Sequence, residues 1–477
     1  MKEKTIYVIV LVCLLLAAIC GIGFPKTSAK RIHHHLQTVK KSSRSTGEFS
    51  SHLPIISIDT HHQQIPEQRE YEGETKRQKT IKTTVSLRDQ LDREHSLSES
   101  PRLSLTALIA YRGNSSRHFD KKSLKLRFIN KSAKPKAVSL AGMSKESEWV
   151  LHGPFLDRTL LRNYLSYNIA GEIMTYAPNV RYCELVVDHQ YCGLYLAVES
   201  IEQGRHRVNI EKSDRKSDKT PYILVWDRRH KAKQALDHYV SYTNQAGLSS
   251  LDIKYPSLHR LTPKQKQFIE KDISHIEKLL YSYDLKQYTD YLDQESFADY
   301  FIINEFFRNI DAGKFSTYLY KDLRDKLKLV VWDFNNAFDN QIEAPYDEAD
   351  FTLSDAPWFC MLLKDPSFVK LVVTRYHQLR QNVLSTDYLI KYIDATVAFL
   401  GPAIQRNYHK WGYVFTVPSR SDATNYLVPA SRNYSSYEAS VKQLKDFIRR
   451  RGRWLDKHIE TLYQYSAPSK NTNTLLE

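Results

Sequence analysis

Two aspartates that flank a predicted β-hairpin constrain this chain more than any other feature of its sequence. Asp311 follows a helical run in "NEFFRNIDAGKFS", and Asp333 follows a strand-like run in "LKLVVWDF". Between them, "STYLYKD" and "LKLVVWDF" are strand-like runs joined by the polar "LRDK", a pattern typical of a hairpin. Each aspartate alone has the pattern of a solvated turn residue. The order of helix, aspartate, hairpin and second aspartate suggests instead that both belong to one site.

The part of the chain before these aspartates shows mainly strand patterns. "LTALIAYRGNSSRHFDKKSLKLRFI" predicts two strands joined by a polar turn at 113–116, with apolar and charged residues alternating in the second strand. "DRTLLRNYLSYNIAGEIM" predicts a helix that Asp157 caps, and "RYCELVVDHQYCGLYLAVESIE" predicts a hairpin that turns near Asp188. Two earlier strands are expected in "LPIISID" and "IKTTVSL".

Helical patterns dominate the remainder. Residues 227–260 are polar and are expected to form an exposed loop. Helices are predicted in "TPKQKQFIEKDISHIEKLLYS", which has proline in its first turn, and in "DQESFADYFIINEFFRN". Residues 364–400 and 436–464 have the periodicity of amphipathic helices. These patterns predict an α+β fold with a β-rich N-terminal part and a mainly helical C-terminal part.

Composition divides the chain into segments. The first contains an uncharged apolar run from Ile6 to Phe24, long enough for a helix across a membrane. The "HHH" run that begins at His33 lies in a polar stretch and is expected to be solvated. The predicted segments are a signal peptide or single transmembrane anchor at 1–24, a flexible basic linker at 25–52, folded parts at 53–226 and 227–464, and a disordered tail at 465–477.

The formal charge of +15 and the isoelectric point near 9.3 are compatible with polyanionic partners. The basic residues are dispersed, however, and no zinc-finger, RRM or basic-zipper spacing is present, so nucleic-acid binding is not expected. Five cysteines do not make a disulfide scaffold. Cys183 and Cys192 flank the predicted hairpin turn and are interpreted as packed thiols, with a disulfide as the alternative if the domain lies outside the cell.

The two aspartates fit the requirements of phosphoryl transfer. That reaction needs a cation on the phosphates, acids that hold magnesium, and a residue that orients the acceptor hydroxyl. Protein kinases place these groups on a lysine-bearing strand, on a D-x-x-x-x-N loop after a helix, and on a D-F-G aspartate beyond a hairpin. Here "DAGKFS" has the loop spacing, with Ser316 in the last position, and "DFN" supplies the later aspartate.

Further candidates lie in the strand-rich part. Lys122 and Lys125 compete as the phosphate-binding lysine, and either could instead belong to a solvated basic face. The turn after the first strand could hold phosphate oxygens through its amides and a guanidinium, or be a tight turn without a ligand; its residues are Arg112, Gly113, Asn114 and Ser115. Glu199 is placed like the end of a kinase hinge strand, or like a strand-end glutamate that faces water.

Five segments in this order resemble the CotH family, the atypical protein kinases named after a bacterial spore-coat protein. They are "YRGNSSRHFDKKSLKLRF", "EWVLHGPFLDRTLLRNYLSYNIAGEI", "VVDHQYCGLYLAVESIE", "NEFFRNIDAGKFSTYLYKD" and "VVWDFNNAF". The resemblance extends from about Leu53 to at least Arg380. It implies a two-lobed kinase-like fold that transfers the γ-phosphate of ATP to serine or threonine, with Mg²⁺ or Mn²⁺ as the metal.

The resemblance also implies roles for single residues. Asp311 matches the catalytic-loop aspartate of the family, Asp333 its metal-binding aspartate, and Ser316 a second metal ligand. Lys122 is preferred as the catalytic lysine because the resemblance centres on "KKS". Many family members have an asparagine in place of Ser316 and a second acid in place of Asn335, so this chain has fewer acidic ligands for a metal.

We therefore expect a kinase that phosphorylates serine or threonine residues of bacterial surface or coat proteins. The alternatives are a pseudokinase that acts as a surface or coat assembly scaffold, and a small-molecule phosphotransferase. The apolar N-terminal segment predicts a protein that is membrane-anchored or exported and extracytoplasmic. Basic residues after that segment outnumber Lys2 and Lys4 before it, which favours a cytoplasmic C-terminal side and leaves the orientation open. The sequence does not indicate an oligomeric state.

Overall fold

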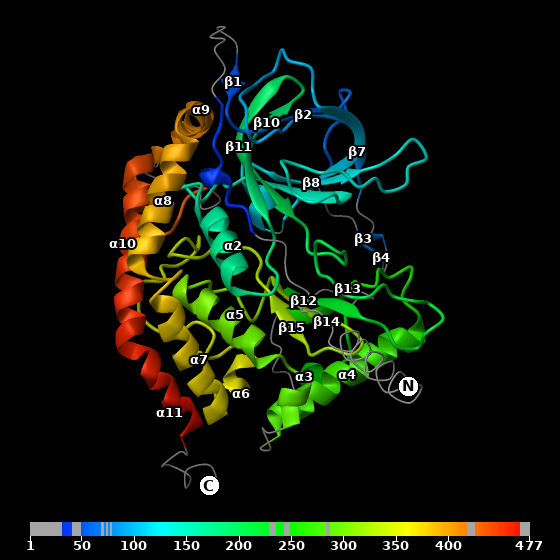
Figure 1. Ribbon diagram of the computed structural model, residues 1–477, viewed down its shortest axis with the longest axis vertical. Coiled ribbons are helices and arrows are strands. Elements are labelled where there is room, and N and C mark those ends of the chain that lie inside the picture. The colour runs from blue at the N-terminus through cyan, green and yellow to red at the C-terminus, as the bar shows by residue number, and fades with distance from the viewer. Residues whose placement is uncertain are drawn as a thin grey trace, which may run out of the picture.

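The computed structural model describes most of the chain (Figure 1). The described residues are 31–40, 49–67, 71–72, 75–76, 79–113, 115–228, 235–242, 249–282, 287–416 and 425–467. The apolar segment predicted at 1–24 and most of the predicted C-terminal tail lie outside these ranges. Within them, no helix has both the length and the apolar character needed to span a membrane.

A closed β-barrel forms the upper part of the molecule in Figure 1. Its strand order is β10 (Val180–Val187), β11 (Gln190–Glu199), β9 (Glu148–His152), β8 (Ser123–Phe128), β7 (Leu103–Arg112), β5 (Ile81–Arg88) and β2 (Ile55–Asp59). The parallel pair β10 and β2 closes the barrel, and the other neighbours are antiparallel. Closure pairs the edge strands with each other. Two small ribbons accompany the barrel, β1 (Ser50–Ser51) with β6 (His95–Ser96) and β3 (Tyr71–Glu72) with β4 (Thr75–Lys76).

The predicted alternation along β8 is confirmed. Leu124, Leu126 and Phe128 are buried in the barrel core, while Lys125 and Arg127 point outward. The predicted hairpin at β10 and β11 is also present. Its turn residues Asp188 and His189 have φ angles of 47° and 62°, which matches the right-handed strand twist as a two-residue hairpin turn requires. Cys183 is buried and Cys192 is partly buried, and both are free thiols, so the interpretation as packed thiols is confirmed.

A second, four-stranded sheet lies below the barrel in Figure 1. Its order is β13 (Ser249–Tyr255), β12 (Tyr222–Arg228), β14 (Thr317–Lys321) and β15 (Lys328–Val330). The last two strands are the hairpin predicted between the aspartates. The prediction of an exposed loop at 227–260 is wrong where it covers β13, because Leu251 and Ile253 are buried in the core. The boundary predicted at 226/227 falls inside β12.

Helices surround this sheet and one side of the barrel (Figure 1). Two of the predicted helices begin at side-chain caps: Thr262 forms a capping box with Gln265, and Asp293 accepts a hydrogen bond from the Ser296 amide. The α-helices are α2 (Arg162–Ile173), α3 (Tyr239–Tyr242), α4 (Pro263–Tyr281), α5 (Gln294–Phe306), α6 (Phe359–Leu362), α7 (Pro366–Arg380), α8 (Thr386–Leu400), α9 (Pro402–Trp411), α10 (Tyr437–His458) and α11 (Tyr463–Ser466). The 3₁₀ helices are η1 (His34–Leu36), η2 (Ser115–His118), η3 (Gln287–Asp290), η4 (Gly412–Phe415), η5 (Ala430–Arg432) and η6 (Ile459–Leu462).

The segment of residues 31–40 differs from its prediction. It was expected to be flexible with solvated histidines, but His34 and His35 are buried. The His34 ring contacts Phe399 edge-on, the His35 ring contacts Tyr392, and both of those aromatic residues belong to α8. Polarity of the sequence does not reveal this because the partners lie more than 300 positions away in the chain.

Candidate active site

Asp311 lies in the loop between α5 and β14. The loop continues α5 through Asn309, whose amide hydrogen-bonds to the Asn304 carbonyl, and its backbone is tightened by the bond from Phe315 N to Asp311 O (2.7 Å). The Asp311 carboxylate accepts a hydrogen bond from Asn336 Nδ2 at 2.7 Å. Ser316, at the end of this loop, has a φ of 49°. Within the described part of the chain, the Ser316 side chain makes no hydrogen bond.

Asp333 follows β15 in a left-handed backbone conformation with a φ of 58°. This conformation is unfavourable for a residue with a Cβ atom. Three polar contacts hold the segment: the Asp333 amide donates to Tyr167 Oη (3.1 Å), the Asp333 carbonyl accepts from Asn309 Nδ2 (3.3 Å), and the next amide, of Phe334, donates to Asn163 Oδ1 (2.9 Å). Helix α2 and the Asp311 loop therefore fix the position of Asp333.

The two predicted acids lie in one site. Asn336 comes from the Asp333 loop and binds the Asp311 carboxylate, while Asn309 comes from the Asp311 loop and binds the Asp333 carbonyl. Burial, together with the negative charge of Asp311, raises the pKa of Asp333 to about 6. Burial also raises the pKa of Asp311, against the lowering effect of its hydrogen bond from Asn336. The two carboxylates thus repel each other in a shared, partly desolvated space.

A third acid contributes to this space and was not predicted. Asp227, near the end of β12, contributes to the raised pKa of both Asp311 and Asp333. Its neighbour Arg228 lies over the Phe315 ring at 4.7 Å and offsets part of the charge on Asp311. The sequence signal was available, because "YILVWDR" is an apolar run that ends in an acid.

Lys122 is not placed toward the two aspartates. Its Nζ binds Glu67 Oε1 at 2.6 Å and the Arg117 carbonyl at 2.7 Å. Lys122 immediately precedes β8 and lies three positions before Lys125. Because side chains alternate between the two faces along an extended chain, the two lysines point to opposite faces. The preference for Lys122 over Lys125 is therefore corrected: Lys125, which lies on the same face as Ser123, is the lysine of this strand that points toward the second sheet.

Lys125 belongs to an ionic cluster between the barrel and the four-stranded sheet. Its Nζ binds Glu148 Oε1 at 2.7 Å, and Lys254 of β13 lies 3.9 Å from Glu202 Oε1. Burial, followed by the charge of Lys254, lowers the pKa of Lys125. Glu202 hydrogen-bonds to Glu148, and burial together with the charge of Glu148 raises the pKa of Glu202. This cluster joins the barrel to the sheet that carries Asp227.

Arg112 connects this cluster to Asp333. It ends β7, pairs across the strands with Ser123, and its guanidinium lies 5.5 Å from the Trp332 ring centroid. The charge of Arg112 lowers the pKa of Asp333 and acts on Lys254. Among the described residues, Arg112 has this ring contact and no ion pair.

The other predicted turn residues differ in how much the structure describes. Gly113 has a φ of 114°, and an added Cβ would lie 2.0 Å from Ser116 Oγ, so the tight turn requires glycine. Asn114 lies outside the described residues, and Ser115 begins η2.

Glu199 is not at a water-facing strand end: it is buried, and its Oε2 accepts hydrogen bonds from the amide and side chain of Asn179. Its Oε2 is thus occupied by the protein, whereas its buried Oε1 has no hydrogen bond among the described residues and lies 3.9 Å from Arg207 Nε.

The prediction of Asp157 as the N-cap of helix α2 is wrong, because α2 begins at Arg162 and its N-cap position is Leu161; Asp157 binds the first turn from further upstream. Asp157 Oδ2 accepts from the Arg162 amide (2.8 Å), and its Oδ1 pairs with Arg162 Nη1 (2.6 Å).

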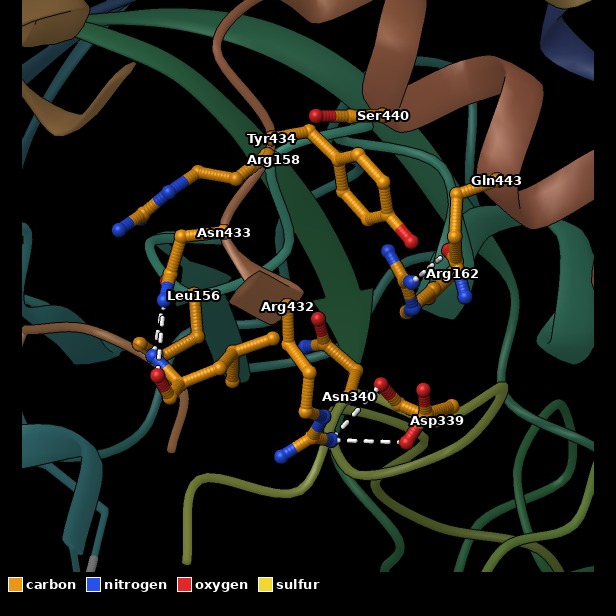
Figure 2. Close-up of a pocket in the computed structure, with 11 residues that line it drawn as sticks. Leu156, Arg158, Arg162, Asp339, Asn340, Arg432, Asn433, Tyr434, Ser440 and Gln443 are labelled. Atoms are coloured by element: carbon orange, nitrogen blue, oxygen red, sulfur yellow. Dashed lines mark hydrogen bonds and ion pairs between the residues drawn. The ribbon is translucent and has the colours of Figure 1, made fainter. Parts of the chain in front are cut away.

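Arg162 also lines a small pocket beside the turn that follows Asp333 (Figure 2). The figure shows Arg432 bound to Asp339 and Arg162 bound to Gln443. The remaining arginine, Arg158, donates to the carbonyls of Phe155 and Asn425. The cations of this pocket are already paired, which indicates a structural role.

The site thus consists of two loops with acidic residues and a barrel whose strands carry Arg112 and Lys125. A family model described as CotH kinase protein matches residues 109–455, well over half of the chain. The chain belongs to the CotH kinase family. Membership implies protein kinase activity, use of ATP and protein substrates at the level of the family. No curated protein matches this chain. The matched residues of this CotH kinase include Arg112, Lys125, Asp311 and Asp333.

The acids of the site fit a divalent metal ion. Among the described residues, no group of three or more His, Cys, Asp or Glu side chains is arranged to hold a metal alone. Mg²⁺ usually takes only one or two carboxylates and completes its shell with water and substrate phosphates. Asp333 and Asp311 are two carboxylates in one partly desolvated space, and the charge of Asp311 helps to raise the pKa of Asp333. A bound divalent cation would offset this repulsion.

Proposed function

We propose that this protein is an ATP-dependent protein kinase of two-lobed architecture, which transfers the γ-phosphate to serine or threonine residues of bacterial surface or coat proteins. The observation that carries the proposal is the juxtaposition of Asp311 and Asp333 in two interlocked loops, with one of them in a strained backbone conformation. Strain that is maintained by several contacts is typical of functional sites. The barrel would form the N-terminal lobe, and the four-stranded sheet with the helices would form the C-terminal lobe.

The residues divide the work of transfer as follows. Asp311 receives the hydrogen bond, and then the proton, of the acceptor hydroxyl, and its raised pKa brings it closer to the pH at which a general base works well. The acceptor oxygen forms its bond to the γ-phosphorus while the bond to the β-phosphate oxygen breaks. Arg112 and Lys125 neutralise phosphate charge from the barrel side. Asp333, with Ser316 as a second ligand, would hold the metal, and a bound Mg²⁺ or Mn²⁺ would offset charge on the transferring group.

The test is incubation of the full-length protein with ATP and Mg²⁺ or Mn²⁺, read by intact mass for phosphate on itself or on an added basic or acidic protein. Asp311→Asn and Asp333→Asn should each lower transfer by at least about a hundredfold, because each removes a charge that acts in the transition state. Asp325→Asn, on the exposed hairpin turn, is the matched control and should transfer like the wild type. Undiminished transfer in both site variants would contradict the assignment.

A second candidate is a pseudokinase that serves as a surface or coat assembly scaffold. Ser316 without a side-chain partner, and Asn335 where many relatives have an acid, favour it. Asn335 Oδ1 accepts a hydrogen bond from Asn163 Nδ2 at 2.8 Å, so it acts as a structural link. Thermal unfolding with ATP separates the two candidates. A kinase gains stability from ATP only with the metal, whereas a scaffold would bind without it or not at all.

A further inference from the structure

Helix α2, which holds the Asp333 segment, is buried on every side. All residues from Arg162 to Ala170 are buried, although the helix has no apolar face and carries several polar side chains. One side presents Asn163 and Tyr167 to the Asp333 segment. Polar side chains on the other side need partners if they are to be buried without a large cost. The partners come from a part of the chain far away in sequence.

Those partners are supplied by residues Arg31–Lys40, which we call the N-terminal arm. His35 binds Tyr164 Oη through its amide (3.0 Å), and His33 Nε2 lies 2.9 Å from Glu172 Oε1. Arg31 binds between these two points, at Asn168. The contacted positions of α2 are spaced by four residues and therefore lie along one face of the helix. The arm covers α2 over most of its length.

Arg31 is the best-anchored residue of the arm. Its guanidinium donates to Asn168 Oδ1 (3.2 Å) and to three carbonyl oxygens: those of Tyr167 (2.8 Å), Ala177 (3.1 Å) and Pro178. The planar fork of arginine suits such a set of acceptors, which a lysine could not reach together. Gly171 makes the space, because a Cβ at this position would lie 2.1 Å from the Arg31 guanidinium. This explains a glycine within a helix, where it otherwise costs stability.

Tyr167, one of the residues that Arg31 binds, also contacts Asp333. Arg31 fixes the Tyr167 carbonyl, and the hydroxyl of the same Tyr167 accepts the hydrogen bond from the Asp333 amide at 3.1 Å. The Tyr167 ring contacts the rings of both neighbours of Asp333, with centroids 5.8 Å from those of Trp332 and Phe334. A shift of Tyr167 would therefore displace the whole segment.

We propose that Arg31 is a positioning residue of the active site, which acts through Tyr167 on Asp333, and that the N-terminal arm is a working part of the kinase domain. The role of Asp333 in phosphoryl transfer rests on the proposed function. The mechanical link from Arg31 to Asp333 does not, because every contact in it is between residues of this chain.

Four variants of the full-length protein test the link: Arg31→Ala, Arg31→Lys, Gly171→Ala, and the double variant Arg31→Ala/Gly171→Ala. Arg453→Ala, an exposed arginine of α10, is the control. The first readout is amide hydrogen exchange of the peptide that contains Asp333 and Phe334. The second is kcat and KM for phosphate transfer from ATP.

Arg31→Ala and Gly171→Ala should each speed exchange of this peptide by about tenfold or more, and lower kcat by roughly ten- to a hundredfold with a smaller change in KM, because the catalytic geometry is displaced. Arg31→Lys should fall between wild type and Arg31→Ala. The decisive result is the double variant: once the guanidinium is gone, the atoms that the Gly171→Ala methyl group would meet first are gone too, so it should add little further loss.

Independent, additive losses in the double variant would overturn the proposal, and so would unchanged exchange at Asp333 in Arg31→Ala. If Arg31→Ala does not fold, Arg31→Lys and Gly171→Ala still give the comparison with Arg453→Ala. If the wild type transfers no phosphate but exchange responds as expected, the proposed function fails and the positioning role stands.

Discussion

Asp333 shows how several contacts can hold one residue in a backbone conformation that is uncommon for residues with a side chain. A left-handed backbone at a residue with a side chain costs about 1–3 kcal/mol. Its own amide and carbonyl and the amide of Phe334 are all hydrogen-bonded, to partners on α2 and in the Asp311 loop. Arg308 and Ser316, at the two ends of the Asp311 loop, also have positive φ angles. Left-handed residues thus occur in both loops that carry the acids, as they do in several other turns of the chain.

Lys125 and Lys122 should differ in their contribution to the use of ATP. Lys125→Met should lower kcat/KM for ATP by about ten- to a hundredfold, the effect of losing one charged hydrogen bond of about 1.5–3 kcal/mol. Lys122→Met should change it by less than about twofold, since the Lys122 ammonium is directed away from the two aspartates, to Glu67 and the Arg117 carbonyl. Steady-state kinetics with varied ATP measure both.

Arg127→Met is the matched control for Lys125→Met. Arg127 also pairs with Glu148, but its side chain is largely exposed. If Arg127→Met lowers kcat/KM as much as Lys125→Met does, the loss comes from the unpaired Glu148 and not from the lysine. Equal losses of kcat/KM in Lys122→Met and Lys125→Met would contradict the choice of Lys125.

At the scale of elements, local patterns predicted what local physics determines. The β10–β11 hairpin, α4 and α5 were predicted because their signals, apolar periodicity and turn residues, lie within the elements themselves, and the structure adds local caps at Thr262 and Asp293. β12 was missed because a short apolar run does not distinguish a strand from a helix. β13 was missed because its polar surroundings hide a strand that only pairing with β12 makes favourable.

For the candidate site, too, the sequence predicted the residues that lie close together in the chain and missed those that come from distant elements. The spacing of Asp311 and Asp333 revealed the two acids, because the hairpin between them is local. It did not reveal Asp227, Asn163 or Tyr167, which reach the site from distant elements. The N-terminal arm is the clearest case, since its histidines have the polarity of a solvated tail and are buried through contacts with the distant elements α2, α8 and β10.

The arm predicts a pH dependence of stability. Burial, assisted by the charge of His33, lowers the pKa of His35 to about 4, and burial lowers that of His34 well below its ordinary value. In the unfolded chain both titrate near 6.5, so between about pH 6.5 and 4 the unfolded state binds more protons and the folded state loses stability as the pH falls. The slope is up to about 1.4 kcal/mol per pH unit for each histidine.

Urea unfolding of the wild type and of His35→Gln at several pH values measures this effect. The wild type should lose stability relative to the variant over this range, because other groups titrate alike in both proteins. His61→Gln, which removes an exposed histidine, should retain the wild-type slope. Parallel curves for wild type and His35→Gln would show that the arm does not titrate as described.

At the scale of the whole molecule, a buried ion pair joins distant parts of the helical region around the site. Arg451 of α10 is fully buried; its Nη2 pairs with Glu305 Oε2 at 2.9 Å, and its Nη1 donates to the carbonyls of Glu348 and Asp350 at 2.7 Å. Glu305 belongs to α5, the helix that leads into the Asp311 loop, and its carboxylate also accepts from the amides of Thr352 and Leu353. One pair thus connects α5, α10 and the chain that follows the Asp333 loop.

Removing one partner of this pair should cost far more than removing both. Arg451→Met leaves the Glu305 carboxylate buried without its cation, which should lower the free energy of unfolding by about 3–5 kcal/mol. In the double variant Arg451→Met/Glu305→Gln no charge remains buried, so part of that loss should be recovered. The neighbouring Arg450, whose exposed guanidinium pairs with Glu348 at 3.1 Å, gives a matched control in Arg450→Met, with an expected change of no more than about 1 kcal/mol. Urea unfolding at pH 7.5 measures all of these. A double variant less stable than Arg451→Met would mean that the hydrogen bonds of Glu305 to α10 and to residues 352–353, rather than its charge, dominate the energy of this junction.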